Sequence, residues 1–119
     1  CRINAEDVSA DFAPRPGHIS FLNLPGGRGV RVDTAIYNGY DIPPYYDSMI
    51  LKCITNGESR LEAIKKMRIA LEELIVEGVP NNVEFLYVLM HEPEFIKGRF
   101  DTGYVDTFVQ ELKDNGTIV

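Results

Sequence analysis

Hydrophobic residues in the first half of the chain recur with the period of β-strands. At the start of a strand predicted over residues 30–37, Val30 and Val32 alternate with two charged residues. This alternation is typical of a strand with one buried face. Residues 48–55 are apolar on both faces and therefore predict a central strand.

Shorter strands and turns are predicted around these two strands. Residues 2–7 predict a short strand that runs into a polar turn, and residues 18–24 predict another strand after a turn at residues 16–17. The glycine-rich residues 25–29 predict a further turn. Residues 38–47 predict a loop, because their two prolines cannot lie in a central strand.

The period changes to that of an amphipathic helix in the second half. Ser59, followed three residues later by Glu62, has the spacing of a capping box. Gly78, with Pro80 beyond it, supplies a stop signal. These signals predict one helix whose inward positions are Leu61, Ile64, Met67, Leu71, Leu74 and Ile75.

Two further helices are predicted towards the C-terminal end. Asn81 with Glu84 predicts the cap of a second helix, which extends to about residue 91 and is ended by the proline that follows. Residues 113–119 are predicted to form a frayed tail. Before that tail, Asp101 or Thr102 is predicted to cap a last helix with inward residues Val105, Phe108, Val109 and Leu112.

The order of these elements, strands first and helices after, indicates an α+β fold. We expect a small antiparallel sheet, formed mostly by the first half, that packs with helices from the second half. The 119 residues fit a single domain spanning residues 1–119. A chain of this size buries very roughly two-thirds of its unfolded surface, so it can form its own core.

The net charge of −6 narrows the classes of partner. A nucleic-acid groove needs clustered lysines and arginines, and docking on anionic membranes needs them too. No apolar run approaches the roughly 20 residues that span a bilayer. We therefore expect neither nucleic acid nor a membrane as a partner.

The cysteines and histidines do not predict a metal site or a disulfide scaffold. The two cysteines, Cys1 and Cys53, are too few to staple a small secreted domain. Together with His18 and His91 they are too widely spaced for a zinc signature. A reducing, cytoplasmic setting is the simplest interpretation, and no metal ligand is predicted.

Three stretches could carry chemistry. The glycines of PGGRGVRVD lead into a strand rather than a helix N-terminus, which favours a hairpin over a phosphate loop. Asp47 stands where the central strand begins, and the cost of burying an unpaired carboxylate means that it is solvated or paired. It could cap a turn or hold an arginine. Arg2, taken alone, is by default a surface charge.

Taken together, six motifs occur in order along the chain: CRINAED, PRPGHI, PGGRGVRVD, GYDIPPYYDSMILK, RLEAIKKMRIALEELIVEGVPNNVEFL and FDTGYV. They resemble the C-terminal domain of biotin carboxylase, the enzyme of the first half-reaction of biotin-dependent carboxylases. The resemblance covers nearly the whole chain. It implies a fragment cut just before Arg2 at a domain boundary, rather than a lipoprotein whose mature form begins with Cys1.

The same resemblance implies that a larger N-terminal part with an ATP-grasp fold is absent from this sequence. In the family that part holds ATP, Mg²⁺ and the bicarbonate base, so the fragment alone is expected to be inactive and to bind no cofactor tightly. The implied partners are the ATP-grasp part of the same chain, the biotin carboxyl carrier protein or domain, and a second copy in a homodimer.

Residue by residue, the resemblance assigns a catalytic role to Arg2, which matches the family's arginine that reaches bicarbonate and the ureido ring of biotin. A guanidinium stays charged and presents a planar fork of donors. Donors fixed where negative charge develops can lower a barrier by roughly 3–4 kcal/mol. Asp47 matches the aspartate of PPYYDSM, and we expect it to support a nearby arginine rather than to take part in the chemistry.

Arg28 and Arg31 match part of the family's homodimer contact. Arg28 replaces an apolar residue often found there, which puts the strength of that contact in question. Val8 replaces the proline that commonly follows AED. The remaining motif residues are interpreted as structural residues that maintain the fold.

The parent enzyme is expected to be a bacterial acetyl-CoA carboxylase that serves fatty acid biosynthesis. Pyruvate, propionyl-CoA and urea carboxylases share this domain and stay open as alternatives. A different class of function, a non-catalytic assembly module that kept the fold, is the competing interpretation.

Overall fold

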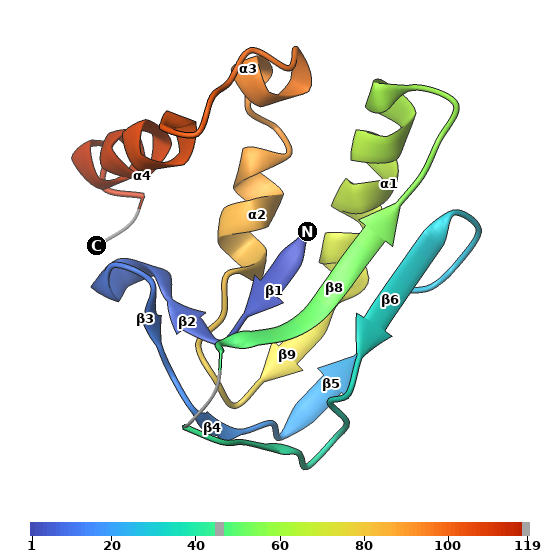
Figure 1. The fold of residues 1–119 in the computed structure, drawn as a ribbon, viewed down its shortest axis with the longest axis vertical. Coiled ribbons are helices and arrows are strands. Elements are labelled where there is room, and N and C mark those ends of the chain that lie inside the picture. The colour runs from blue at the N-terminus through green and yellow to red at the C-terminus, as the bar shows by residue number, and fades with distance from the viewer. Residues whose placement is uncertain (45–46, 118–119) are drawn as a thin grey trace.

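The computed structural model describes residues 1–44 and 47–117. Figure 1 shows a layer of strands beside a layer of helices, and the extents of 38 × 37 × 21 Å reflect this flattened shape. The elements are β1 (Arg2–Asn4), β2 (Glu6–Asp7), a 3₁₀ turn η1 (Val8–Ala10), β3 (Ala13–Pro14), β4 (Gly17–His18), β5 (Phe21–Asn23), β6 (Val30–Thr34), β7 (Asp41–Ile42), β8 (Met49–Thr55), α1 (Arg60–Glu73), β9 (Ile75–Glu77), α2 (Val83–Leu89), α3 (Pro93–Ile96) and α4 (Tyr104–Asp114).

The main sheet has the antiparallel order β1-β8-β6, so the strand predicted to be central is central. Three two-stranded pairs, β2-β3, β4-β7 and β5-β9, extend the strand layer. The α+β prediction is therefore confirmed, with several small sheets in place of one.

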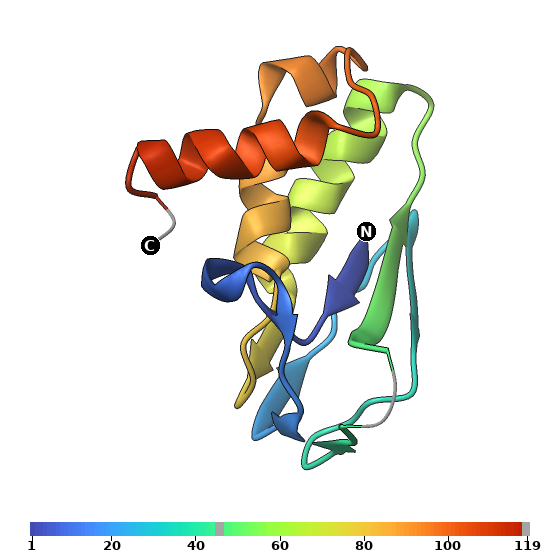
Figure 2. The same cartoon turned by 60° about the vertical axis from the view of Figure 1, so that its left-hand side comes forward.

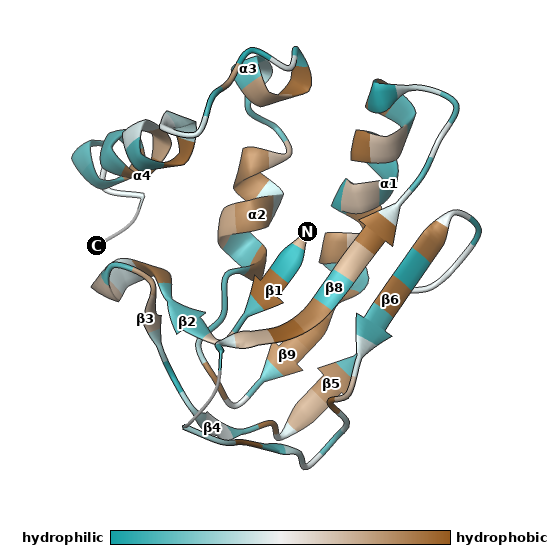
Figure 3. Cartoon of the chain, in the orientation of Figure 1, coloured by the Kyte–Doolittle hydropathy of each residue, from teal (hydrophilic) through white to brown (hydrophobic). Residues whose placement is uncertain are grey.

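Helices α1 and α2 lie on one face of the main sheet, and α4 crosses beyond α2 (Figure 2). The core forms between these layers, where Ile3 of β1 and Leu51 and Cys53 of β8 are almost completely buried. From α1, Ile64 and Met67 close the core over β8. Figure 3 shows the resulting apolar stretches along β1, β8 and α2. None of the helices in the described residues is both long and apolar enough to cross a membrane.

The first helix ends earlier than the sequence predicts. It stops at Glu73, and Leu74 already has an extended backbone. Residues 75–77 then form β9, which pairs with β5 instead of adding another helical turn. The prediction that the helix continues to the glycine at position 78 is wrong because β-branched Ile75 and Val76 gain strand partners from a distant segment.

The region predicted as one strand over residues 18–24 is divided between two sheets. His18 belongs to β4, which pairs with β7, whereas Phe21 begins β5, which pairs with β9. The turn predicted at residues 16–17 is also wrong, because Gly17 lies in β4. The chain turns earlier instead, at residues 11–12, where both backbones are left-handed.

The cap of α1 is confirmed, since the Ser59 hydroxyl accepts a hydrogen bond from the Glu62 N–H at 3.2 Å. The other two predicted caps are shifted, because α2 begins after Asn82 and α4 begins after Gly103. Helix α4 runs on to Asp114, so the predicted tail begins too early. Residues 118–119 of that tail lie outside the described residues, as do Tyr45 and Tyr46 of the predicted loop. Three residues predicted to face inward, Leu61, Ile75 and Val105, are exposed instead.

Candidate functional site

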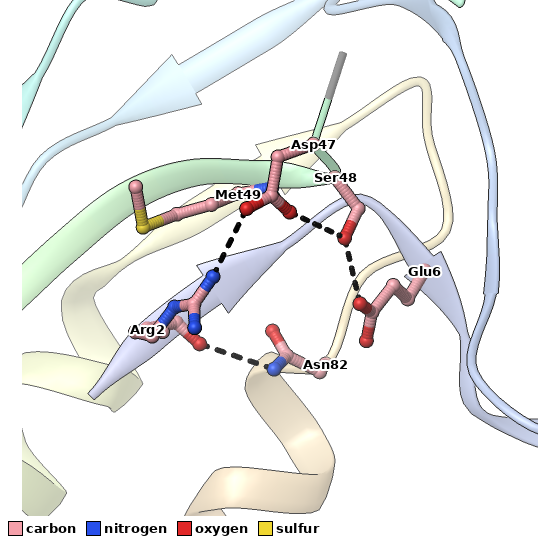
Figure 4. A network of polar contacts seen from close by, with 6 residues as sticks. All are labelled: Arg2, Glu6, Asp47, Ser48, Met49 and Asn82. Atoms are coloured by element: carbon pink, nitrogen blue, oxygen red, sulfur yellow. Dashed lines mark hydrogen bonds and ion pairs between the residues drawn. The ribbon is translucent and has the colours of Figure 1, made fainter.

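Arg2 lies on the face of the main sheet opposite the helices. Its neighbour Ile3 points into the core, so the alternation of β1 directs the Arg2 side chain outward, where it is 60% exposed. One guanidinium nitrogen of Arg2 donates to a carboxylate oxygen of Asp47 at 3.2 Å. The structure thus brings together the two residues for which the sequence predicts a catalytic and a supporting role (Figure 4).

Asp47 contacts the start of β8 as well as Arg2. Its second carboxylate oxygen accepts the backbone N–H of Met49 at 3.2 Å and lies 3.5 Å from the Ser48 hydroxyl oxygen. The Ser48 hydroxyl also contacts Glu6 at 2.7 Å (Figure 4). Both alternatives that the sequence left open for Asp47 are therefore present: it caps a turn and it holds an arginine.

Asn82 anchors the backbone of Arg2, which the sequence did not predict. It is the one buried polar residue among the described residues. Its amide donates to the Arg2 carbonyl at 3.1 Å and accepts the Asn4 N–H at 2.8 Å. The sequence predicted only a helix cap at the neighbouring Asn81, and the Asn81 side chain does accept the Val83 N–H at 3.1 Å.

A second cation, Lys52, lies beside Arg2. The β1–β8 register places Lys52 directly opposite Arg2, on the same exposed face. On its other side Lys52 is opposite Asp33 of β6, whose carboxylate is bound by Arg31 at 2.9 and 3.0 Å. Sequence reasoning passed over Lys52. Only the strand register, which one sequence does not provide, shows that it neighbours Arg2.

The other two predicted site residues, Arg28 and Arg31, lie away from the Arg2–Asp47 pair. Arg28 is exposed in the turn before β6, and Arg31 is exposed on β6, with β8 between it and β1. Asp33 raises the pKa of Arg31, chiefly through the hydrogen bonds between the two side chains. These two arginines therefore form a separate surface at the other edge of the main sheet.

The face around Arg2 is open rather than hollow. A cavity of about 140 Å³ lies next to Asp47, lined also by Met49 and Ile50. Closed ligand sites usually enclose about 300–1,000 Å³, so this cavity is too small for a whole ligand. Among the described residues, no cluster of histidines, cysteines and carboxylates could hold a metal ion. Within this part of the chain, the open face presents the donors of Arg2 and Lys52, which can bind an anion.

Comparison with known proteins gives consistent matches. The family model described as the biotin carboxylase C-terminal domain matches residues 1–107. The chain is 50% identical over 108 residues to "Biotin carboxylase 1" of Bacillus subtilis, an alignment that covers 91% of this chain and 24% of that protein. It is 49% identical over 108 residues to a pyruvate carboxylase subunit of Methanothermobacter thermautotrophicus, covering 91% of this chain and 22% of that protein.

Solved structures agree with these matches. The biotin carboxylase domain of Hydrogenobacter thermophilus 2-oxoglutarate carboxylase superposes with a TM-score of 0.88 at 42% identity, covering 90% of this chain and 24% of that one. That structure is a dimer in complex with MgADP, ADP and bicarbonate. The chain thus spans about a quarter of the length of the proteins it matches.

Proposed function

The chain belongs to the biotin carboxylase C-terminal domain family, and we propose that it forms one wall of the active site of a longer enzyme. That enzyme would use ATP and bicarbonate to carboxylate biotin carried on a carrier protein or domain. The observation that carries this proposal is the Arg2–Asp47 pair on the open face of the main sheet, with Lys52 opposite Arg2. An arginine held in place and left exposed is suited to bind an anion that another domain presents.

Arg2 has the donors that this task requires. A guanidinium carries five N–H donors in a planar fork, and the hydrogen bond to Asp47 uses one of its nitrogens. The remaining donors can contact bicarbonate and the ureido oxygen of biotin. Bound biotin would supply the ureido nitrogen that accepts the carboxyl group, and Arg2 would stabilise the negative charge that develops beside it.

Asp47 acts as a positioning residue in this proposal. An isolated exposed ion pair contributes about 0–1 kcal/mol and does not by itself fix a long side chain. Asp47, however, also accepts the Met49 N–H, so its carboxylate presents a fixed acceptor to Arg2. The neutral Asp47→Asn variant should therefore leave Arg2 charged but less well placed.

The rest of the active site is assigned to the part of the enzyme that this sequence lacks. We assign ATP and Mg²⁺ to an ATP-grasp part, and expect the chain alone to be inactive. The chain covers 24% of the Bacillus subtilis protein and 24% of the 2-oxoglutarate carboxylase domain, which supports this division. The surface that carries Arg28 and Arg31 is proposed as a homodimer contact, supported by the dimer of the 2-oxoglutarate carboxylase domain.

Variants of the full parent enzyme test the proposal, assayed by biotin-dependent ATP hydrolysis with bicarbonate. Losing a donor at a developing charge typically lowers turnover by 10²–10³-fold, and we expect about this loss for Arg2→Ala. Arg2→Lys keeps the charge but loses the planar fork of donors, so its turnover should be only slightly higher than that of Arg2→Ala. Asp47→Asn should lower turnover with less effect on ATP binding. Arg15→Ala, at an exposed arginine 3.8 Å from Asp7, is the matched control. Full turnover by Arg2→Ala would refute the proposal.

For the acyl acceptor we propose acetyl-CoA, in fatty acid biosynthesis. The chain is 50% identical to a biotin carboxylase and 49% identical to part of a pyruvate carboxylase, so we expect the acceptor to be chosen by other domains. Assaying the complete carboxylase with acetyl-CoA, propionyl-CoA, pyruvate and urea tests this assignment. A preference for any of the other three would overturn the acetyl-CoA assignment and leave the proposed role of Arg2 intact.

A further inference from the structure

The only two cysteines of the chain are direct neighbours in the main sheet. Cys1 stands at the start of β1 and Cys53 in β8, and they exchange both backbone hydrogen bonds of an antiparallel pair. The Cys1 nitrogen donates to the Cys53 carbonyl at 2.7 Å, and the Cys53 N–H donates to the Cys1 carbonyl at 2.9 Å. The register of the two strands, with Arg2 opposite Lys52, continues to this pair.

Both thiols lie on the core face of the sheet. Cys53 is fully buried, and Cys1 is half-buried and packs against the core. Cys1 also lines an open cavity of about 320 Å³, together with Arg60, Met67 and Phe95. A small solute can therefore approach Cys1 from this cavity, whereas Cys53 is fully buried and does not line it.

We propose that Cys1 and Cys53 are a thiol pair that closes into a reversible cross-strand disulfide. Opposite residues that exchange both hydrogen bonds have Cα atoms about 5.5 Å apart, within the 4.4–6.8 Å that disulfides span. Opposite Cβ atoms lie about 4.5–5.5 Å apart, slightly more than the 3.5–4.5 Å of a disulfide. Closing the bond therefore draws the strands together, and the strained product is readily reduced.

The oxidant is a small disulfide of the glutathione type, and the exchange has two steps. The Cys1 thiolate attacks one sulfur of the oxidant, forms a mixed disulfide and releases the first small thiolate. The Cys53 thiolate then attacks the Cys1 sulfur, closes the protein disulfide and releases the second small thiolate. The two protein thiols lose two protons and two electrons, and the small disulfide takes up both to become two thiols. Burial raises the pKa of the Cys53 thiol, so little of it is thiolate at neutral pH and the second, intramolecular step is expected to be the slower of the two.

The disulfide would join β1 to β8 at the residue that immediately precedes Arg2. This consequence rests on the proposed function, in which the position of Arg2 on β1 matters. A strained bond at this point moves the strand that carries Arg2 relative to the strand end where Asp47 stands. Oxidation is therefore expected to lower the turnover of the parent enzyme, and reduction by dithiothreitol to restore it.

The thiols themselves provide the test, independently of enzyme activity. The 119-residue chain, with its fold checked by circular dichroism, is treated with oxidised glutathione and analysed by intact mass and by tryptic mapping. We expect the loss of two hydrogens, the loss of both free thiols, and one disulfide-linked pair of peptides that joins Cys1 to residues 53–60. Cleavage after Lys52 and Arg60 releases the second peptide of that pair.

Two variants separate the steps. Cys53→Ala should stop at a lasting glutathione adduct on Cys1, and Cys1→Ser should not react while it is folded. Two free thiols in the treated wild-type chain would overturn the proposal. So would a glutathione adduct that persists in the wild type, or a disulfide-linked dimer on a non-reducing gel. Because none of these outcomes involves turnover, they are distinct from a failure of the role proposed for Arg2.

Discussion

Replacing Asn82 by alanine should destabilise the fold by removing both contacts between its amide and β1. The substitution leaves the Arg2 carbonyl and the Asn4 N–H without the partners that now lie at 3.1 and 2.8 Å. A partly buried backbone group left unpaired costs about 1–3 kcal/mol. For two such groups, with some replacement by water, we expect a loss of about 2–4 kcal/mol.

That loss is large for a protein of this size. Domains are typically stable by about 5–15 kcal/mol, so the variant should stay folded with its melting temperature lowered by roughly 10 °C. Urea unfolding followed by circular dichroism measures the free energy directly. Amide hydrogen exchange should locate the effect, with the Asn4 N–H exchanging faster than its neighbours.

Two comparison variants define what would refute this reasoning. Asn115→Ala changes an exposed asparagine and should shift the unfolding free energy by less than about 0.5 kcal/mol. Asn82→Asp keeps an acceptor for the Asn4 N–H but loses the donor to the Arg2 carbonyl, so it should also be destabilised. If Asn82→Ala proved as stable as Asn115→Ala, the amide would not be what holds β1 in place.

Three further predictions concern the rest of the fold. Gly78→Ala should lower the free energy of unfolding by at least about 2 kcal/mol, because Gly78 has φ of +106° and the new Cβ would meet a carbonyl of β4. Gly116→Ala, where φ is +72° and the space is open, should lower it less in the same unfolding experiment. The pKa of Tyr104 is raised to about 12, first by burial and then by a hydrogen bond to the Glu92 carboxylate, so a step near pH 12 in an ultraviolet titration should disappear in Tyr104→Phe. Lys113 lowers the pKa of Asp11, so their pair stabilises the fold above the ordinary carboxyl range and loses this effect as pH falls through the lowered value. In Lys113→Met, Asp11 should titrate by NMR near its ordinary value.

The elements set by local patterns could be predicted from the sequence. The apolar run of β8 indicated a central strand, and Ser59 indicated the start of α1. The error at residues 74–77 has a physical cause. In the sequence, Leu71, Leu74 and Ile75 have the i, i+3, i+4 spacing of a helical stripe, whereas in the structure Leu74 and Val76 are buried and Ile75 is exposed, which is the alternation of a strand. The partner that decides between the two, β5, lies about fifty residues earlier in the chain.

The candidate site was predictable only in part, because its contacts also join residues far apart in the sequence. The sequence predicted that Asp47 is solvated or paired, and left open whether it caps a turn or holds an arginine. Which arginine it holds depends on the pairing of strands 45 residues apart, and only the resemblance to a family indicated Arg2. The sequence predicted no role for Asn82, because its amide bonds residues about 80 positions away.

Two separate elements of the fold hold Arg2, one at its backbone and one at its side chain. Asn82 of the α2 cap binds its backbone, and Asp47 at the start of β8 binds its side chain. An ordered arginine side chain costs up to about 2 kcal/mol in lost rotamer freedom, which one exposed ion pair does not offset. Mutating Asn82 and mutating Asp47 should therefore have different effects. Asn82→Ala should reduce stability strongly, whereas Asp47→Asn should reduce it little and reduce turnover more. The double variant should show the sum of the two stability losses within about 0.5 kcal/mol. A larger deviation would mean that backbone and side chain of Arg2 are positioned as one unit.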